Sequence, residues 1–323
     1  MQDYLWKVKA VGTATQYQLH SNLAAEFSAS DYYAAKDTDF NRIPSEKCMW
    51  IWCWYATHEA ASFRDVADRF NIALSTLHLL IENVSTFLSL KSDTVIKWPN
   101  YDEQQQIATD FSELGFPDVI GCMDGTHVRI DKPETDAEKN IILCRFKQFV
   151  IPKKRIRDIF IGYPGSVHDA RVFKNSPLYP SLPAKCGNRY ILADSAYPCL
   201  KHVLTPYRDS GNLNAIERNY NYTLSRCRIN IEHTFGILKQ KFRQLYHLKL
   251  RNISSICHFI KACCVTYNLT RDIKEEIDET IEENDEQGHE YNLHDMELED
   301  DEFEGNLAGH NFRNYIAALI FNQ

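Results

Sequence analysis

The sequence predicts a mixed α/β protein with a helical region before the α/β domain and an acidic segment after it. Between residues 49 and 90, apolar residues recur with the spacing of amphipathic helices. From residue 119 onward, short apolar runs that end in polar or turn residues alternate with helical stretches, as expected of an α/β domain. We therefore divide the chain into an unassigned segment (1–48), a helical region (49–100), an α/β domain (101–270), an acidic disordered tail (271–305) and an amphipathic helix (306–323).

The helical region is predicted to contain three helices, over residues 49–59, 63–70 and 73–88. Ser62 is placed to cap the second helix, because its hydroxyl can accept a hydrogen bond from the first helical turn. Asn71 is a turn residue shortly before the third helix. Three helices with a tight turn before the last one resemble a helix-turn-helix.

Two interpretations of this region remain open. The helix at 73–88 reads DNA bases, or the three helices form a structural packing unit. The helix has no Lys or Arg before Lys91 and carries Glu82, whereas contacts with phosphates normally need cations. This charge pattern favours the packing unit.

The α/β domain is predicted to contain strands over residues 119–130, 156–165 and 188–198, and helices over about 225–242 and 253–269. Beyond the acidic tail, apolar residues return at positions i, i+3, i+4, i+7 and i+8, which predicts a short amphipathic helix. These positions are Phe312, Tyr315, Ile316, Leu319 and Ile320. The helix either docks back onto the domain or binds a partner.

The net charge of −8 and the pI of about 5.8 argue at first against a protein that binds nucleic acid. The acidic residues are unevenly distributed, however. Residues 271–305 contain 17 of the 44 acids and two bases, a local net charge of −15, which leaves 27 acids and 34 bases, a net charge of +7, on the remainder. The body of the protein is therefore mildly basic, and DNA remains a candidate partner.

The cysteines and the apolar runs indicate a cellular compartment. None of the ten cysteines forms a CxxC pair, and no secretory signal is visible, so free thiols in a reducing environment are expected. No stretch approaches the ~20 apolar residues of a membrane helix, so we expect no membrane partner. These observations favour the nucleus or the cytoplasm.

Three acidic residues lie at or just past the ends of predicted strands: Asp124, Asp169 and Asp194. A carboxylate at the end of a buried strand is costly unless it is neutralised, and Mg²⁺ or Mn²⁺ can neutralise it because hard cations prefer oxygen ligands. Glu232 lies inside a predicted helix, four residues after Arg228, which can form a salt bridge with it. Each carboxylate can equally be a surface or turn residue, since 44 acids offer many such patterns.

Five motifs occur in a fixed order: GFPDVIGCMDGTHVRI (115–130), YPGSVHDARVFKNSPLY (163–179), YILADSAYP (190–198), LTPYR (204–208) and RCRINIEHTFGILKQKFR (226–243). Together they resemble the PIF/Harbinger transposase superfamily of DDE endonucleases, and within it the domesticated Harbinger transposase-derived nucleases of animals. The resemblance extends from about Phe63 to Asn268. Five ordered motifs make a specific match, whereas one motif alone would be weak.

The resemblance implies a ribonuclease H-like domain with a DDE catalytic site, carried by Asp124 in DGTH, Asp194 in ADSAY and Glu232 in IEHTFG. Asp169 in SVHD matches a further acidic position that looks like a metal ligand, so all four residues are candidate ligands. The implied cofactor is Mg²⁺ or Mn²⁺, because carboxylates clamp two cations ~3.5–4 Å apart in two-metal phosphoryl chemistry. The implied partners are DNA and a separate Myb/SANT-like DNA-binding protein.

Basic residues around Glu232 are candidates for binding DNA phosphates: Arg226, Arg228, Lys239, Lys241 and Arg243. They can equally form a solvated helix face with ion pairs four residues apart. His127 and His168 adjoin the acids, where a plain hydrogen-bonding role competes with binding phosphate or moving protons.

The interval at 139–158 departs from the family pattern, because the strand expected there is not recognisable. FKQFVI (146–151) is a candidate replacement, but Pro152 follows at once and cannot donate to a ladder. Residues 1–45 also match poorly. Two hypotheses follow: a metal-dependent, transposase-derived DNA nuclease of the nucleus, or a catalytically inactive DNA-binding or adaptor protein that kept the fold.

Overall fold

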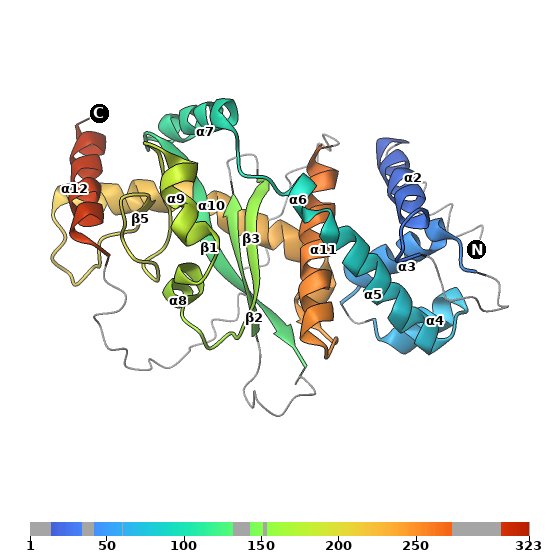
Figure 1. Cartoon of the computed structure of the whole chain (residues 1–323). Helices are drawn as coiled ribbons and strands as arrows, with labels where there is room; N and C mark the ends of the chain where they lie inside the picture. Colours follow the sequence, from blue (N-terminus) through green and yellow to red (C-terminus); the bar gives the residue numbers. More distant parts are fainter. Residues whose placement is uncertain are drawn as a thin grey trace.

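The computed structural model describes residues 14–33, 42–59, 61–131, 143–150, 154–272 and 305–322, the segment 143–150 by its backbone alone. Residues 273–304, which make up most of the tail predicted to be disordered, lie outside the described part of the chain. Figure 1 shows helices at both ends of the molecule and a sheet between them.

The N-terminal part of the described chain is helical. Its elements are α2 (Ala14–Ser28), α3 (Ser45–Thr57), α4 (Phe63–Phe70), α5 (Leu74–Leu90) and α6 (Ser92–Val95). The three helices predicted at 49–59, 63–70 and 73–88 correspond to α3, α4 and α5. The fully buried Trp52 and Tyr55 of α3 lie against Phe259 at ring-centroid distances of 5.7 and 5.6 Å. These aromatic rings connect the helical part to the remainder of the core.

The helices α4 and α5 are joined by a short turn, as predicted, and their resemblance to a helix-turn-helix stays a prediction. Ser62 and Asp65 form a reciprocal capping box at the start of α4, and Asn71 takes a left-handed conformation (φ 49°) at its end. The two helices are bent by 102° relative to each other. Within the described residues no single helix is long and apolar enough to cross a membrane, and this bent pair passes that test only by combined length and composition.

Most of α5 is used for packing. Leu77, Leu80, Ile81 and Val84 are buried, at the spacing expected of one helix face. Near its start the helix is exposed: Leu79 keeps 61% of its surface. The burial agrees with the interpretation of this region as a packing unit, and base reading by α5 stays a prediction.

The described strands form a six-stranded mixed sheet with β3-β2-β1-β4-β5 as its main order. The strands are β1 (Val119–Ile130), β2 (Leu143–Val150), β3 (Ile156–Tyr163), β4 (Tyr190–Leu192), β5 (Val203–Leu204) and β6 (His247–Leu248). Neighbours among β1, β2 and β3 pair antiparallel, whereas β4 and β6 pair parallel to β1, and β5 pairs parallel to β4. The strands predicted at 119–130, 156–165 and 188–198 are present, the last one shortened to three residues.

Strand β2 occupies the interval that departs from the family pattern. It pairs with β1 from Cys122↔Val150 to Arg129↔Leu143, and on its other side with β3. The alternative that FKQFVI (146–151) replaces the family strand therefore agrees with the backbone, because β2 includes residues 146–150. Pairing of β2 with β1 ends at Val150, and Pro152 lies outside the described residues.

Helices surround the sheet. They are α7 (Tyr101–Glu113), α8 (Asp169–Lys174), α9 (Leu178–Cys186), α10 (Ala215–Lys241), α11 (Ile253–Asp272) and α12 (Leu307–Phe321), with a 3₁₀ turn η1 (Arg243–Leu245). Helix α10 crosses behind the sheet, and α11 lies between the sheet and α5 (Figure 1). Helix α10 begins ten residues before its predicted start, because Asn214 and Glu217 form a capping box there.

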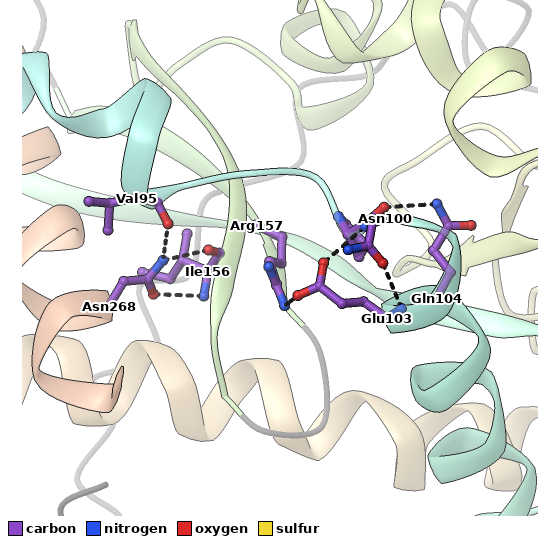
Figure 2. Close-up of polar contacts among 8 residues, drawn as sticks. Val95, Asn100, Glu103, Gln104, Ile156, Arg157 and Asn268 are labelled. Atoms are coloured by element: carbon purple, nitrogen blue, oxygen red, sulfur yellow. Dashed lines mark hydrogen bonds and ion pairs between the residues drawn. The ribbon is translucent and has the colours of Figure 1, made fainter. Parts of the chain in front are cut away.

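A buried amide connects α11 to the edge of the sheet (Figure 2). The side chain of Asn268, which is fully buried, donates to the carbonyl of Ile156 at 2.7 Å and accepts from its N–H at 3.0 Å. The amide also donates to the carbonyl of Val95 at 3.5 Å. Asn268 thereby pairs with β3 as a neighbouring strand would, and it joins this edge to the end of α6.

Helix α12 docks back onto the domain rather than standing free. The N–H of Asn306 donates to the carbonyl of Cys199 at 3.0 Å, and the guanidinium of Arg313 lies 4.0 Å from the ring centroid of Tyr207. Ile316, Ala317 and Ile320 are buried. Of the two alternatives left open by the sequence, the structure shows docking.

Candidate functional site

Two neighbouring parallel strands bring Asp124 and Asp194 together. Cys122 in β1 is in register with Leu192 in β4. Side chains alternate between the faces of a sheet with a period of two residues. Asp124 and Asp194 each lie two residues beyond this pair, so they continue side by side on one face.

The guanidinium of Arg228, from α10, lies between these two carboxylates. One of its terminal nitrogens is 2.9 Å from Oδ2 of Asp124 and 3.9 Å from Oδ2 of Asp194. Backbone groups hold the other oxygens: the N–H of Gly125 donates to Oδ1 of Asp124 at 2.6 Å, and the N–H of Ala196 donates to Oδ1 of Asp194 at 2.9 Å. The carboxylates are thus oriented by backbone on one side and joined by a cation on the other.

Asp124 is the electrostatic centre of this cluster. Its side chain is only 14% exposed, and burial together with the negative charges of Asp194 and Asp169 raises its pKa from 3.8 to about 7. The charge of Arg228 and the hydrogen bond from Gly125 act in the opposite direction but do not cancel this effect. The site therefore needs more positive charge than Arg228 supplies to keep Asp124 fully ionised at neutral pH.

Asp169 joins the cluster from a different element. It is the first residue of α8, which follows the turn after β3. A Cβ atom at position 125 would lie 2.6 Å from Oδ1 of Asp169 and 3.4 Å from its Cγ. The residue after Asp124 must therefore be glycine if the Asp169 carboxylate is to lie against β1 at this distance.

Glu232 lies one helical turn after Arg228 on α10, and its side chain is exposed. It makes no side-chain hydrogen bond or ion pair with the residues that the structure describes. Its charge still reaches the cluster: the Cys122 thiol, whose pKa burial raises well above the usual value, is also affected by the charges of Arg228, Asp124 and Glu232. The structure thus brings Asp124, Asp169 and Asp194 together and places Glu232 at their margin.

The chemistry of these side chains fits a hard divalent cation, because the candidate ligands are carboxylate oxygens in a region of unfavourable negative charge. Their placement differs from that of a formed metal centre. No group of three or more His, Cys, Asp and Glu side chains within the described ranges is arranged to hold a metal ion. The cation between Asp124 and Asp194 is the guanidinium of Arg228.

The five basic residues predicted to bind DNA divide into two groups. Arg228, Lys239 and Lys241 contact the protein itself: Lys239 donates to the carbonyl of His127 at 3.0 Å, and Lys241 lies 3.5 Å from Oγ1 of Thr270. Burial also lowers the pKa of Lys239. The other two, Arg226 and Arg243, are exposed.

The two histidines occupy different positions. His127 is half-buried in β1, three residues after Asp124, and His168 is an exposed residue directly before α8. Sequence reasoning did not assign Gly125 to the site, although its place in DGTH, directly after a candidate ligand, was a usable signal. The contact of Arg228 with Asp124 had no signal in the sequence.

Comparison with known proteins identifies the class to which this fold and cluster belong. Residues 123–268 match the family described as DDE superfamily endonuclease, a range that begins one residue before Asp124 and ends at Asn268. The chain therefore contains a DDE superfamily endonuclease domain, and the resemblance drawn from its motifs is confirmed at this level.

Curated relatives agree with this assignment at low identity. The chain is 24% identical over 236 residues to "Protein ALP1-like" of Arabidopsis thaliana, covering 65% of this chain and 57% of that protein. It is 24% identical over 216 residues to the human protein named "Putative nuclease HARBI1", covering 64% and 61%, and 26% identical over 225 residues to the mouse protein of that name, covering 64% and 62%. The chain thus spans about 60% of the length of these distant relatives. No solved structure matches.

Proposed function

We propose that this protein is a divalent-metal-dependent endonuclease that hydrolyses phosphodiester bonds in DNA. The observation that carries the proposal is the meeting of Asp124, Asp169 and Asp194, from β1, α8 and the end of β4, inside a DDE superfamily endonuclease domain. These residues are far apart in the sequence, so they meet because the fold brings their elements together and not because they are neighbours in one loop.

The architecture of the sheet supports the finer assignment to the ribonuclease H-like folds. Three antiparallel strands, β3, β2 and β1, are followed by β4 and β5, which run parallel to β1. The pairing of β2 with β1 also supports the proposal. A missing strand in this interval was the main argument from the sequence against an active enzyme.

In the proposed mechanism, Asp124 and Asp194 would hold the divalent cation, with Asp169 and Glu232 as further ligands. The cation, when bound, would polarise the phosphoryl group and lower the pKa of an attacking water molecule. The N–H groups of Gly125 and Ala196 orient one oxygen of each main ligand. No covalent nucleophile from the protein is required.

The test is cleavage of supercoiled plasmid DNA by the purified chain with Mg²⁺ or Mn²⁺. We expect nicked and linear products that disappear with a chelator and in Asp194→Asn. Asp209→Asn, a substitution at an exposed loop carboxylate, is the matched control and should cleave like the wild type. Absence of cleavage with both metals, or equal cleavage by wild type and Asp194→Asn, would contradict the proposal.

A second candidate function is a catalytically inactive DNA-binding or adaptor protein, which acts in the nucleus with a Myb/SANT-like partner. It is favoured by the guanidinium between Asp124 and Asp194 and by the exposed side chain of Glu232. Salt-dependent DNA binding without cleavage, unchanged in Asp194→Asn, is the expected result for this function. Binding that depends on Asp194 and metal would exclude it.

A further inference from the structure

The contact of Arg228 with two candidate metal ligands is not explained by the proposed nuclease activity. We propose that Arg228 is an internal counter-ion that competes with the divalent cation for Asp124 and Asp194, so that metal binding requires its guanidinium to leave. This inference rests on the proposed function, because it concerns the same carboxylates. It assigns to Arg228 the control of metal binding, in place of the phosphate contact expected from the sequence.

The first argument is the geometry of the four carboxylate oxygens. Oδ1 of Asp124 and Oδ1 of Asp194 each accept a hydrogen bond from a backbone N–H within two residues. The remaining oxygens, both Oδ2, face the same terminal nitrogen of Arg228, at 2.9 and 3.9 Å. A cation that bridges the two strands through these oxygens would need the space that this nitrogen fills.

The second argument is electrostatic. The Arg228 and Asp124 side chains are 15% and 14% exposed, so water screens their charges weakly. A guanidinium and a divalent cation within a few ångströms of each other would repel strongly there. A divalent cation in place of the guanidinium would bring two positive charges to the three carboxylates instead of one, which favours the exchange.

An alternative role for Arg228 makes the opposite prediction. If the guanidinium only orients Asp124 and Asp194 and stays in place when metal binds, removing it would leave the ligands less ordered and weaken metal binding. If it competes, removing it vacates the space beside both Oδ2 atoms and strengthens metal binding. The sign of the change in affinity therefore separates a competing counter-ion from a positioning residue.

The experiment measures Mn²⁺ affinity of the full chain by electron paramagnetic resonance of free Mn²⁺, together with thermal unfolding in the presence and absence of the metal. In Arg228→Met, which keeps length but removes charge, we expect binding that is tighter by about tenfold or more. We also expect a lower Tm without metal and a larger rise in Tm on adding it.

Matched variants locate the effect. Arg218→Met removes the same charge from an exposed position of the same helix and should leave Mn²⁺ affinity within about twofold of the wild type. Arg228→Lys retains the charge and should bind Mn²⁺ more weakly than Arg228→Met. Asp194→Asn should abolish the tight binding in both the wild-type and the Arg228→Met backgrounds.

The outcomes distinguish this inference from the proposed function. If wild type binds Mn²⁺ through Asp194 but Arg228→Met binds it equally or more weakly, the competition is overturned while the metal site stands. If neither protein binds Mn²⁺, or Asp194→Asn binds as well as the wild type, both the inference and the proposed metal site fail. Circular dichroism of each variant shows whether it is folded, and Arg228→Gln replaces Arg228→Met if the latter is not.

Discussion

At the scale of single residues, Asp124 shows that ionisation of a carboxyl group in this site is unfavourable. Its carboxyl group is buried beside two further acids, and its pKa is raised to about 7. The folded protein therefore holds a proton on Asp124 over a pH range in which the unfolded chain has already lost it. Such a group lowers stability as the pH rises, and a bound cation reverses that loss.

This leads to a pH dependence in the metal-free protein. The folded state gains stability from protonated Asp124 below about pH 4, and this gain is lost as the pH rises from 3.8 to about 7. Between pH 5 and pH 8, Asp124→Asn should therefore gain on the order of 2 kcal/mol of unfolding free energy relative to the wild type. Urea unfolding in the presence of a chelator measures the difference at each pH.

The control for this effect is Asp102→Asn, which changes an exposed carboxyl group on α7. Its difference from the wild type should be the same at both pH values. A difference between Asp124→Asn and the wild type that does not change with pH would show that Asp124 is ionised at its ordinary value in the folded protein.

Part of the site was predictable at this scale and part was not. Asp124 and Asp194 stand at or just past the ends of apolar runs, so their proximity follows from strand pairing alone. Arg228 could not be placed in the same way. Its contact depends on the position of α10 against a strand more than 100 residues earlier, and no local pattern in the sequence records that position.

At the scale of elements, β2 was the strand that the sequence indicated least clearly. Helices α4 and α5 carry their own signals, a capping box and a regular apolar face. The place of β2 in the sheet instead comes from its partners, because β1 and β3 provide a ladder on each side. Tertiary pairing of this kind overrides a weak local propensity.

Helix α10 contains a glycine whose replacement by alanine should stabilise the protein. Gly236 lies inside this helix, and a Cβ atom added there would meet nothing within 4 Å. Gly236→Ala should therefore raise the free energy of unfolding by about 0.5–1 kcal/mol, because it reduces the backbone entropy of the unfolded chain. Thermal or urea unfolding measures the effect, and a less stable variant would mean that the position is not open.

Gly125→Ala provides the contrast, since a Cβ atom there would lie 2.6 Å from Oδ1 of Asp169. It should not be stabilising. The two variants change the same atom count in the same domain, so a difference between them reports the local surroundings alone.

At the scale of the whole molecule, the sheet is held between two groups of helices that come from distant parts of the sequence (Figure 1). On one side Asn268 of α11 joins β3 to Val95 at the end of α6, and Arg157 of β3 forms an ion pair with Glu103 of α7 (Figure 2). On the other side α12 packs against α10 and β5 and contacts Cys199, five residues after Asp194. Stability of the carboxylate cluster should therefore depend on residues that do not touch it.

The variant Ile316→Ala tests this dependence. Ile316 is 3% exposed, so its truncation should lower the free energy of unfolding by about 2–4 kcal/mol. Amide hydrogen exchange at residues 194–200 should rise more than in the remainder of the domain. Leu307→Ala is the control, since Leu307 is 76% exposed and its change should stay within about 0.5 kcal/mol. Uniform exchange in Ile316→Ala would show that α12 does not support this loop.

The docking of α12 also bears on the order of events during synthesis. The ribosome releases a chain from its N-terminus onward, so Asp124, Asp194 and Arg228 emerge before Asn306 and the helix that follows it. A nascent chain can build the sheet and α10, but the loop after Asp194 obtains its contact with α12 only afterwards. The loop after Asp194 therefore gains this hydrogen bond late in synthesis, after the acidic segment has emerged.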